Sequence, residues 1–90
     1  MITQLINNTG NAVKNQFVIT EGSTKTFQSY DTTICKMAPF APSAVIFLDP
    51  KWCYSQTTLK HLKTFLNISD SKAQILKDIK DKKYIIKNLN

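Results

Sequence analysis

Arginine is absent from this chain of 90 residues, so all 12 of its basic residues are lysines. Arginine offers a planar fork that reads phosphate or guanine through two hydrogen bonds, whereas lysine offers a single point charge. Proteins that read a specific DNA sequence commonly use such forks. The lack of arginine therefore disfavours a sequence-specific DNA-binding protein.

Residue types that hold metals or carry out catalysis are also scarce. The chain has one histidine, His61, two cysteines, Cys35 and Cys53, and only two glycines. These are too few ligands for a structural zinc site, and no glycine-rich loop could cradle a phosphate. Cys53 and His61 lie eight positions apart, without a third group to orient them as a nucleophile and base. We therefore expect no enzyme, no metal and no cofactor, with Cys53 packed near Trp52.

Long apolar runs are missing as well. The longest uninterrupted apolar run covers residues 44–48, which is too short to cross a bilayer. Residues 1–20 lack a basic segment followed by an apolar block, so no secretory signal is predicted. We expect a single domain over residues 1–90, located in the cytoplasm, with no membrane partner. The hydrophobic content of 42% is sufficient for a folded core.

The strongest structural signal starts at Ser55, a favourable N-cap for a helix. Apolar residues follow at the spacing of one helical face: Leu59, Leu62, Phe65 and Leu66. Asn67 is a suitable end, because asparagine tolerates the left-handed conformation. A second helix is predicted after a cap at Ser69 or Asp70 and should end near Asp81. Its expected apolar stripe consists of Ala73, Leu76 and Ile79, flanked by Ile75.

Short β-prone segments precede and follow these helices. The strand candidates are Ile2–Ile6, which could also be a terminal arm, and residues 16–20, 25–30, 32–37, 44–48 and 84–87. The sequence therefore predicts an α+β fold, with a small antiparallel sheet of about four strands and two helices packed on one face. We expect the helices to cover the side of the sheet that carries Phe17, Phe27 and Phe47.

Aromatic residues suggest a surface for a partner. Trp52 and Tyr54 precede the first helix, and Phe40 lies in a loop bounded by Pro39 and Pro42. The candidate partner-binding residues are Phe40, Trp52, Tyr54, Lys60 and Lys63. Such aromatic and basic groups are typical of a surface for single-stranded nucleic acid, and also of a protein interface. The alternative is packing in the core, which we favour for Trp52, whereas we favour an interface for Phe40.

The whole chain has a formal net charge of +6, and its lysines are concentrated in the last third. The candidate nucleic-acid-binding residues are Lys72, Lys77, Lys80, Lys82, Lys83 and Lys87. A lysine-rich face of this kind can attract a phosphate backbone. The simpler interpretation is a solvated helix face.

Several blocks of this sequence are similar to a family of short proteins of unknown function that are encoded by bacteriophages and related mobile elements. The blocks are NQFVI at 15–19, FQSY at 27–30, FLD at 47–49, WCYSQTT at 52–58, Tyr84, and LN at 89–90. The order of the blocks is kept over nearly the whole chain. The chain departs from the pattern at residues 39–42, where a tight hairpin turn is usual, and at Lys82 and Lys83, where a glycine commonly precedes the last strand.

The resemblance implies a phage origin and a location in the host cytoplasm, but no transferable activity. Together with the small size and the missing catalytic groups, it predicts a non-enzymatic accessory protein that binds a host macromolecule, a protein or a ribonucleoprotein. Such a protein would act as an inhibitor of a host defence system, in the manner of an anti-CRISPR protein, or as a host-takeover factor. The alternative function is a nucleic-acid-binding module that uses the C-terminal lysines. The sequence predicts no particular oligomeric state for the protein.

Overall fold

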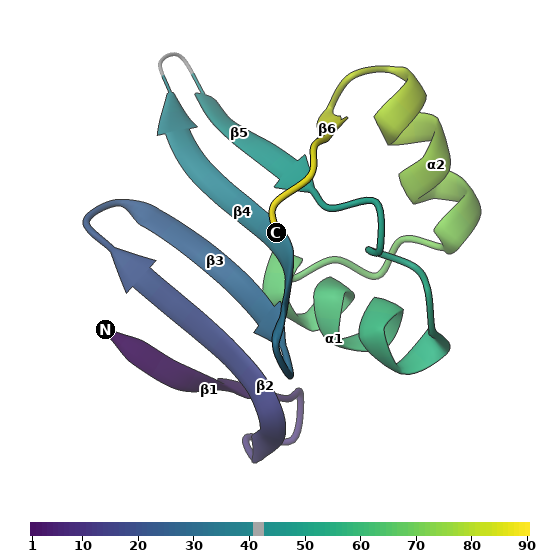
Figure 1. The fold of residues 1–90 in the computed structure, drawn as a ribbon. Coiled ribbons are helices and arrows are strands. Elements are labelled where there is room, and N and C mark those ends of the chain that lie inside the picture. Colours follow the sequence, from purple (N-terminus) through teal and green to yellow (C-terminus); the bar gives the residue numbers. More distant parts are fainter. Residues whose placement is uncertain (41–42) are drawn as a thin grey trace.

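A computed structural model describes residues 1–40 and 43–90, with side chains at residues 1–39 and 45–90. Six strands form one sheet in the order β1-β2-β3-β4-β5-β6 (Figure 1). The strands are β1 (Ile2–Ile6), β2 (Ala12–Glu21), β3 (Thr24–Ser29), β4 (Thr32–Phe40), β5 (Ser43–Leu48) and β6 (Tyr84–Ile86). The helices α1 (Gln56–Leu66) and α2 (Lys72–Lys80) lie between β5 and β6.

The predicted α+β class is confirmed, but the sheet has six strands instead of about four. Strands β1 to β5 form an antiparallel meander, and β6 pairs with β5 in the parallel direction. Parallel pairing follows from the connection, because the chain returns to the sheet through both helices. The count was wrong because Ile2–Ile6 pairs with β2 and Tyr84–Ile86 pairs with β5, so both are edge strands of the sheet.

One face of the sheet carries the core. Phe27 lies opposite Cys35, which in turn lies opposite Leu48, so the three side chains share a face. They pack with Leu62 of α1 and Ile75 of α2, and all five are fully buried. The two helices therefore cover the same face of the sheet, as predicted (Figure 1).

The prediction that Phe17 and Phe47 share this covered face is wrong. Phe17 lies opposite Gln28 and Phe47 lies opposite Lys36, one position out of step with Phe27. Alternation along a strand therefore sends both rings to the other face, which we call the outer face. There the Lys87 ammonium lies 5.4 Å from the centroid of the Phe47 ring.

Helix α1 begins and ends as the sequence predicts. The Ser55 hydroxyl accepts a hydrogen bond from the Thr58 N–H at 3.0 Å, which satisfies one of the free donors in the first turn. At the other end Asn67 has a φ of 56°. The N–H groups of Asn67 and Ile68 donate to the carbonyls of Thr64 and Lys63, respectively, the pattern of a Schellman motif.

Helix α2 differs from the prediction in its cap and in its buried face. Ser71 is the cap, and its hydroxyl accepts from the Gln74 N–H at 3.2 Å, so neither Ser69 nor Asp70 has this role. The buried side chains are Ile75 and Asp78, whereas Leu76 is 50% exposed. The predicted stripe is therefore correct for Ile79, which packs against the core, and wrong for the exposed Ala73 and Leu76, because the fully buried residue is Ile75.

A turn after β5 sets the start of the segment that leads to α1. The Asp49 carbonyl accepts from the Trp52 N–H at 2.9 Å, and the buried Asp49 carboxylate accepts from the Lys51 and Leu89 N–H groups. The side-chain amide of Asn90 also donates to Asp49 and to the Thr33 carbonyl. These contacts join the C-terminal residues to the turn that positions α1.

Candidate functional site

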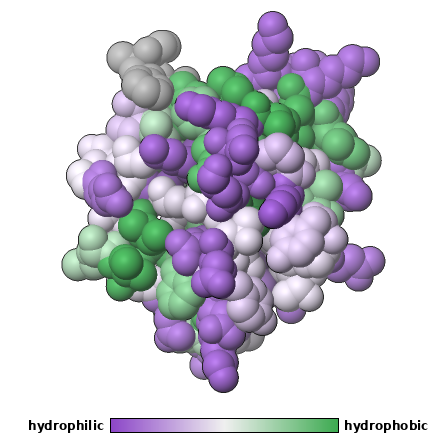
Figure 2. Space-filling view, viewed as in Figure 1, coloured by the Kyte–Doolittle hydropathy of each residue, from purple (hydrophilic) through white to green (hydrophobic). Residues whose placement is uncertain are grey.

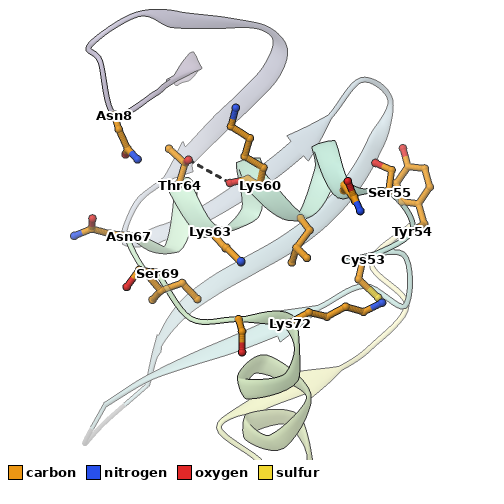
Figure 3. Close-up of a pocket in the computed structure, with 14 residues that line it drawn as sticks. Asn8, Cys53, Tyr54, Ser55, Lys60, Lys63, Thr64, Asn67, Ser69 and Lys72 are labelled. Atoms are coloured by element: carbon orange, nitrogen blue, oxygen red, sulfur yellow. Dashed lines mark hydrogen bonds between the residues drawn. The ribbon is translucent and has the colours of Figure 1, made fainter.

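A cleft of about 1050 Å³ lies between α1 and the segment 67–72 that enters α2 (Figure 3). Residues 53–56, which lead into α1, close one end of the cleft. Asn8 of the β1–β2 turn, far away in the sequence, also lines it. Its volume is comparable to that of small-molecule sites in other proteins. The lining combines charged, hydroxyl and apolar groups, and we call it the α1 cleft.

The charge of the α1 cleft has one sign. Lys60 and Lys63 come from α1 and Lys72 comes from the first position of α2, whereas no Asp or Glu belongs to the described lining. Figure 3 shows the side chain of Lys63 in the space between α1 and segment 67–72 and that of Lys72 extending toward Cys53, while Lys60 points to the other side of α1. Lysines without acidic partners create a positive potential in a cleft.

Ion pairing does not neutralise these lysines. In the part of the chain that the structure describes, the single ion pair joins Lys83 to Asp78 at 3.9 Å. Lys63 is partly buried, so its apolar stem packs against the protein while its charge lies at the cleft. A negatively charged ligand in the α1 cleft would compensate this charge.

The N-termini of both helices line the same cleft. Ser55 caps α1 and Ser71 caps α2, and both residues are part of the lining. Each cap satisfies one backbone N–H of its first turn, and further N–H groups at a helix start have no intrahelical partner. The positive ends of the two helix dipoles therefore add to the charge of the lysines.

The apolar part of the lining consists of Cys53, Leu59 and Ile68, all of them partly buried. Tyr54 is 61% exposed at the end of the cleft where α1 begins. A tyrosine ring with this exposure offers a flat surface to a partner or a ligand. The α1 cleft thus offers positive charge, hydrogen-bond donors and an aromatic surface within one concave region.

Cys53 and His61 do not form a nucleophile–base pair among the described residues. Cys53 lines the cleft, His61 does not belong to the described lining, and no hydrogen bond joins the two. Partial burial, together with the neighbouring Lys60 charge, lowers the pKa of His61 below its ordinary value. The other thiol, Cys35, is fully buried, and burial raises its pKa to about 12.

The structure brings together three of the five predicted partner-binding residues. Tyr54, Lys60 and Lys63 line the α1 cleft. Trp52 is only 4% exposed and belongs to the core, so its assignment as a contact residue was wrong, whereas its alternative role in core packing is confirmed. The ring of Phe40 lies outside the described side chains, although its backbone ends β4.

The six C-terminal lysines do not form one surface around the α1 cleft. Lys72 lines the cleft, whereas Lys77 and Lys80 lie in the last turn of α2, where a cation favours the helix dipole. Lys82 and Lys83 follow in the turn after α2, and Lys87 lies over Phe47 on the outer face. Of these six lysines, Lys72 is therefore the one that lines the described part of the α1 cleft.

Sequence reasoning missed the polar lining that comes from outside α1. The side chains concerned belong to Asn8, Asn67, Ser69 and Ser71. The polar run 67–71 between two predicted helices was a detectable sign of an exposed connection. Nothing in the local sequence could place Asn8 beside this connection, because the contact depends on the tertiary fold.

The outer face of the sheet is a second surface with aromatic and basic groups. A continuous row of paired residues crosses all six strands of this face: Ile2, Ile19, Thr26, Lys36, Phe47 and Ile85. Ile2 is 67% exposed and Ile85 is 41% exposed. In the view of Figure 2, hydrophobic residues form small separate patches between hydrophilic ones. Exposed apolar residues that are scattered in this way are normal on a protein surface.

The chain belongs to a family of unknown function, DUF8033, which it matches over residues 1–83. The match extends from β1 through α2 and therefore includes every residue that lines the α1 cleft. No curated protein and no solved structure matches the chain.

Two further findings concern metal binding and membrane insertion by the described residues. Their His, Cys, Asp and Glu side chains form no group of three that could hold a metal ion. Neither of the two helices in the described ranges has the length and apolar character needed to span a bilayer.

Proposed function

We propose that this chain is a small phage accessory protein without enzymatic activity that binds a negatively charged surface of a host macromolecule through the α1 cleft. The observation that carries the proposal is the presence of Tyr54, Lys60 and Lys63 in the lining of one concave surface without acidic lining residues in the described structure. Exposed tyrosine beside uncompensated positive charge is typical of binding surfaces.

The phage origin and the host partner are supported by the sequence blocks NQFVI, FQSY and WCYSQTT, which resemble those of short phage proteins. Within that role, the proposed partner is a host protein or a ribonucleoprotein in the host cytoplasm. Binding to such a partner would inhibit a host defence system or divert another host process. A small basic protein can inhibit a partner simply by covering part of its surface. Attraction between opposite charges would speed the encounter with a negatively charged partner.

Affinity capture from a lysate of the bacterial host tests this function. The tagged wild-type protein should recover a specific macromolecule, and a Tyr54→Ala/Lys60→Ala variant should lose it. The matched control is Tyr30→Ala/Lys25→Ala, because Tyr30 is 59% exposed, Lys25 is exposed, and neither belongs to the described lining of the cleft. Equal recovery by both variants, or no specific partner for the wild type, would contradict the proposal.

The second candidate function is a nucleic-acid-binding module that uses the C-terminal lysines. The observation that favours it is the placement of Lys72 in the α1 cleft together with Lys63. Binding of this kind should weaken steeply as salt rises, because neutralised phosphates release counterions. If a Lys77→Ala/Lys80→Ala variant lost as much affinity for a single strand as a Lys63→Ala/Lys72→Ala variant, the whole lysine-rich region and not the cleft would be the site.

A further inference from the structure

The lining of the α1 cleft indicates which anionic group it could accept. Its polar members are lysines, hydroxyl and amide side chains, and the start of two helices. These are the groups that contact phosphate oxygens in complexes with nucleic acids. A carboxylate partner is instead typically held by the arginine fork, which this chain lacks.

Lys63 and Lys72 provide the most direct phosphate contact. Lys63 projects from α1 into the space between α1 and segment 67–72, and Lys72 extends from the start of α2 toward Cys53, so the two lysines line the cleft from different sides (Figure 3). A bound anion would offset the repulsion between two positive charges that line one cleft. The α2 cap, Ser71, directly precedes Lys72, so backbone N–H groups of the first α2 turn lie beside the lysine.

The size of the cleft and the position of Tyr54 suggest more than a bare phosphate. A volume of about 1050 Å³ can hold a group much larger than one phosphate ion. The Tyr54 ring is 61% exposed at the cleft end where α1 begins. Nucleobases stack on such rings irrespective of base identity, since every base has a flat π-face.

We propose that the α1 cleft binds a nucleotide unit, with its phosphate between Lys63 and Lys72 and its base on Tyr54. This inference deepens the proposed function and rests on it, because it names the chemical group of the macromolecule that the cleft would recognise. A free nucleotide and a nucleotide within a single strand carry the same phosphate ester and base. Both are therefore candidate sources of the ligand.

A titration followed by the amide NMR shifts of the whole protein tests the inference. The probes are inorganic phosphate, uridine monophosphate, a short single strand of uridine nucleotides, and a glutamate peptide of the same charge as the strand. We expect the nucleotide probes to shift amides of Tyr54, Lys63 and Lys72 and their neighbours. Affinity that grows with strand length would identify nucleic acid as the source, whereas similar affinity for the monophosphate would identify a free nucleotide.

Matched variants connect the shifts to the residues. Lys63→Ala/Lys72→Ala should weaken strand binding about tenfold or more, whereas the control Lys77→Ala/Lys80→Ala, with the same change in net charge, should weaken it much less. The single variant Lys72→Gln changes an exposed residue and should reduce the slope of log affinity against log salt by about 0.7. Tyr54→Ala should weaken binding about fivefold or more, and Tyr30→Ala should leave it unchanged.

Three results would overturn the inference. The glutamate peptide could bind as tightly as the strand, the shifts could lie outside the α1 cleft, or the Lys63→Ala/Lys72→Ala variant could bind like the wild type. Inorganic phosphate that bound as tightly as uridine monophosphate would overturn the stacking role of Tyr54. If a host partner were captured through the cleft but no nucleotide probe bound, this inference would fail while the proposed function stood. If neither bound, both would fail.

Discussion

Replacement of Asp49 by asparagine should destabilise the fold through the turn that positions α1. The Asp49 side chain is 2% exposed and accepts hydrogen bonds from the Lys51 N–H at 3.0 Å, the Leu89 N–H at 2.9 Å and the Asn90 amide at 3.0 Å. An asparagine has the same shape, but it carries no charge and its NH₂ group must face at least one of these donors. The substitution therefore removes acceptors without creating a cavity.

The expected loss follows from the number of these bonds. A hydrogen bond to a charged group contributes about 1.5–3 kcal/mol. Asparagine weakens the bonds that its oxygen still accepts and loses at least one bond, where its NH₂ group faces a donor. We expect a loss of about 2–4 kcal/mol in the free energy of unfolding, a large share of the roughly 5–13 kcal/mol typical for a domain of this length. The thermal midpoint should fall by roughly 10 °C or more.

Acid should reveal the same interaction. Burial by itself raises the pKa of Asp49, but the hydrogen bonds from Leu89, Lys51 and Asn90, together with the Lys51 charge, hold it below the ordinary value. A pKa lowered by folding stabilises the protein above the unfolded-state pKa of about 3.9. This stabilisation is lost as the pH falls through the lower folded-state pKa, so wild type and Asp49→Asn should converge in strong acid.

Urea unfolding, followed by the fluorescence of the single and buried Trp52, measures the effect across this pH range. The control is Asp31→Asn, which makes the same change at an exposed position in the turn between β3 and β4. If Asp49→Asn were as stable as this control near pH 7, or if its acid dependence matched that of the wild type, the reasoning would be refuted.

Three further predictions follow from other local contacts. A thiol reagent should label the partly buried Cys53 in the folded protein and the fully buried Cys35 only after unfolding, which peptide mass spectrometry would show; equal labelling would contradict the burial. Lys82 has a φ of 64°, so Lys82→Gly should be more stable to urea than Lys82→Ala by about 1 kcal/mol, and equal stability would contradict a left-handed cap. Ser55→Ala should cost about 1 kcal/mol by leaving the Thr58 N–H without its acceptor, whereas Ser55→Asp should retain most of the stability; equal losses would argue against the cap.

Local features of the fold were predictable where short-range chemistry decides them. The cap at Ser55 and the left-handed end at Asn67 were confirmed, because each depends on a residue and its neighbours within one helical turn. Lys82 illustrates the same point. The sequence resemblance leads one to expect a glycine just before the last strand, and Lys82 at this place adopts a positive φ.

Features that depend on register were not predictable. Whether Phe17 faces the helices depends on its pairing with Gln28, and a shift of one position reverses the face. Sequence alternation also missed the burial of both Ile34 and Cys35, which are adjacent in the chain. The pairing of β3 with β4 passes from Cys35 directly to Thr33, so Ile34 is an extra residue in a bulge.

The candidate site was predictable in part. The aromatic and basic pattern around the first helix named Tyr54, Lys60 and Lys63, and all three line the α1 cleft. Core packing of Trp52, which the sequence analysis favoured, is confirmed, and the turn at Asp49 fixes its position. Lys72 was assigned to a separate lysine-rich region, since only the packing of α2 brings it to the cleft.

The dissociation constant of the captured host partner for a Tyr54→Ala/Lys60→Ala/Lys63→Ala variant tests the account most directly. It should be compared with that for Tyr30→Ala/Lys77→Ala/Lys80→Ala, which makes the same substitutions outside the described lining of the α1 cleft. We expect the cleft variant to bind at least about a hundredfold more weakly than this control, the sum of one lost aromatic contact and two lost charges. Equal affinity of the two variants would show that the partner binds elsewhere.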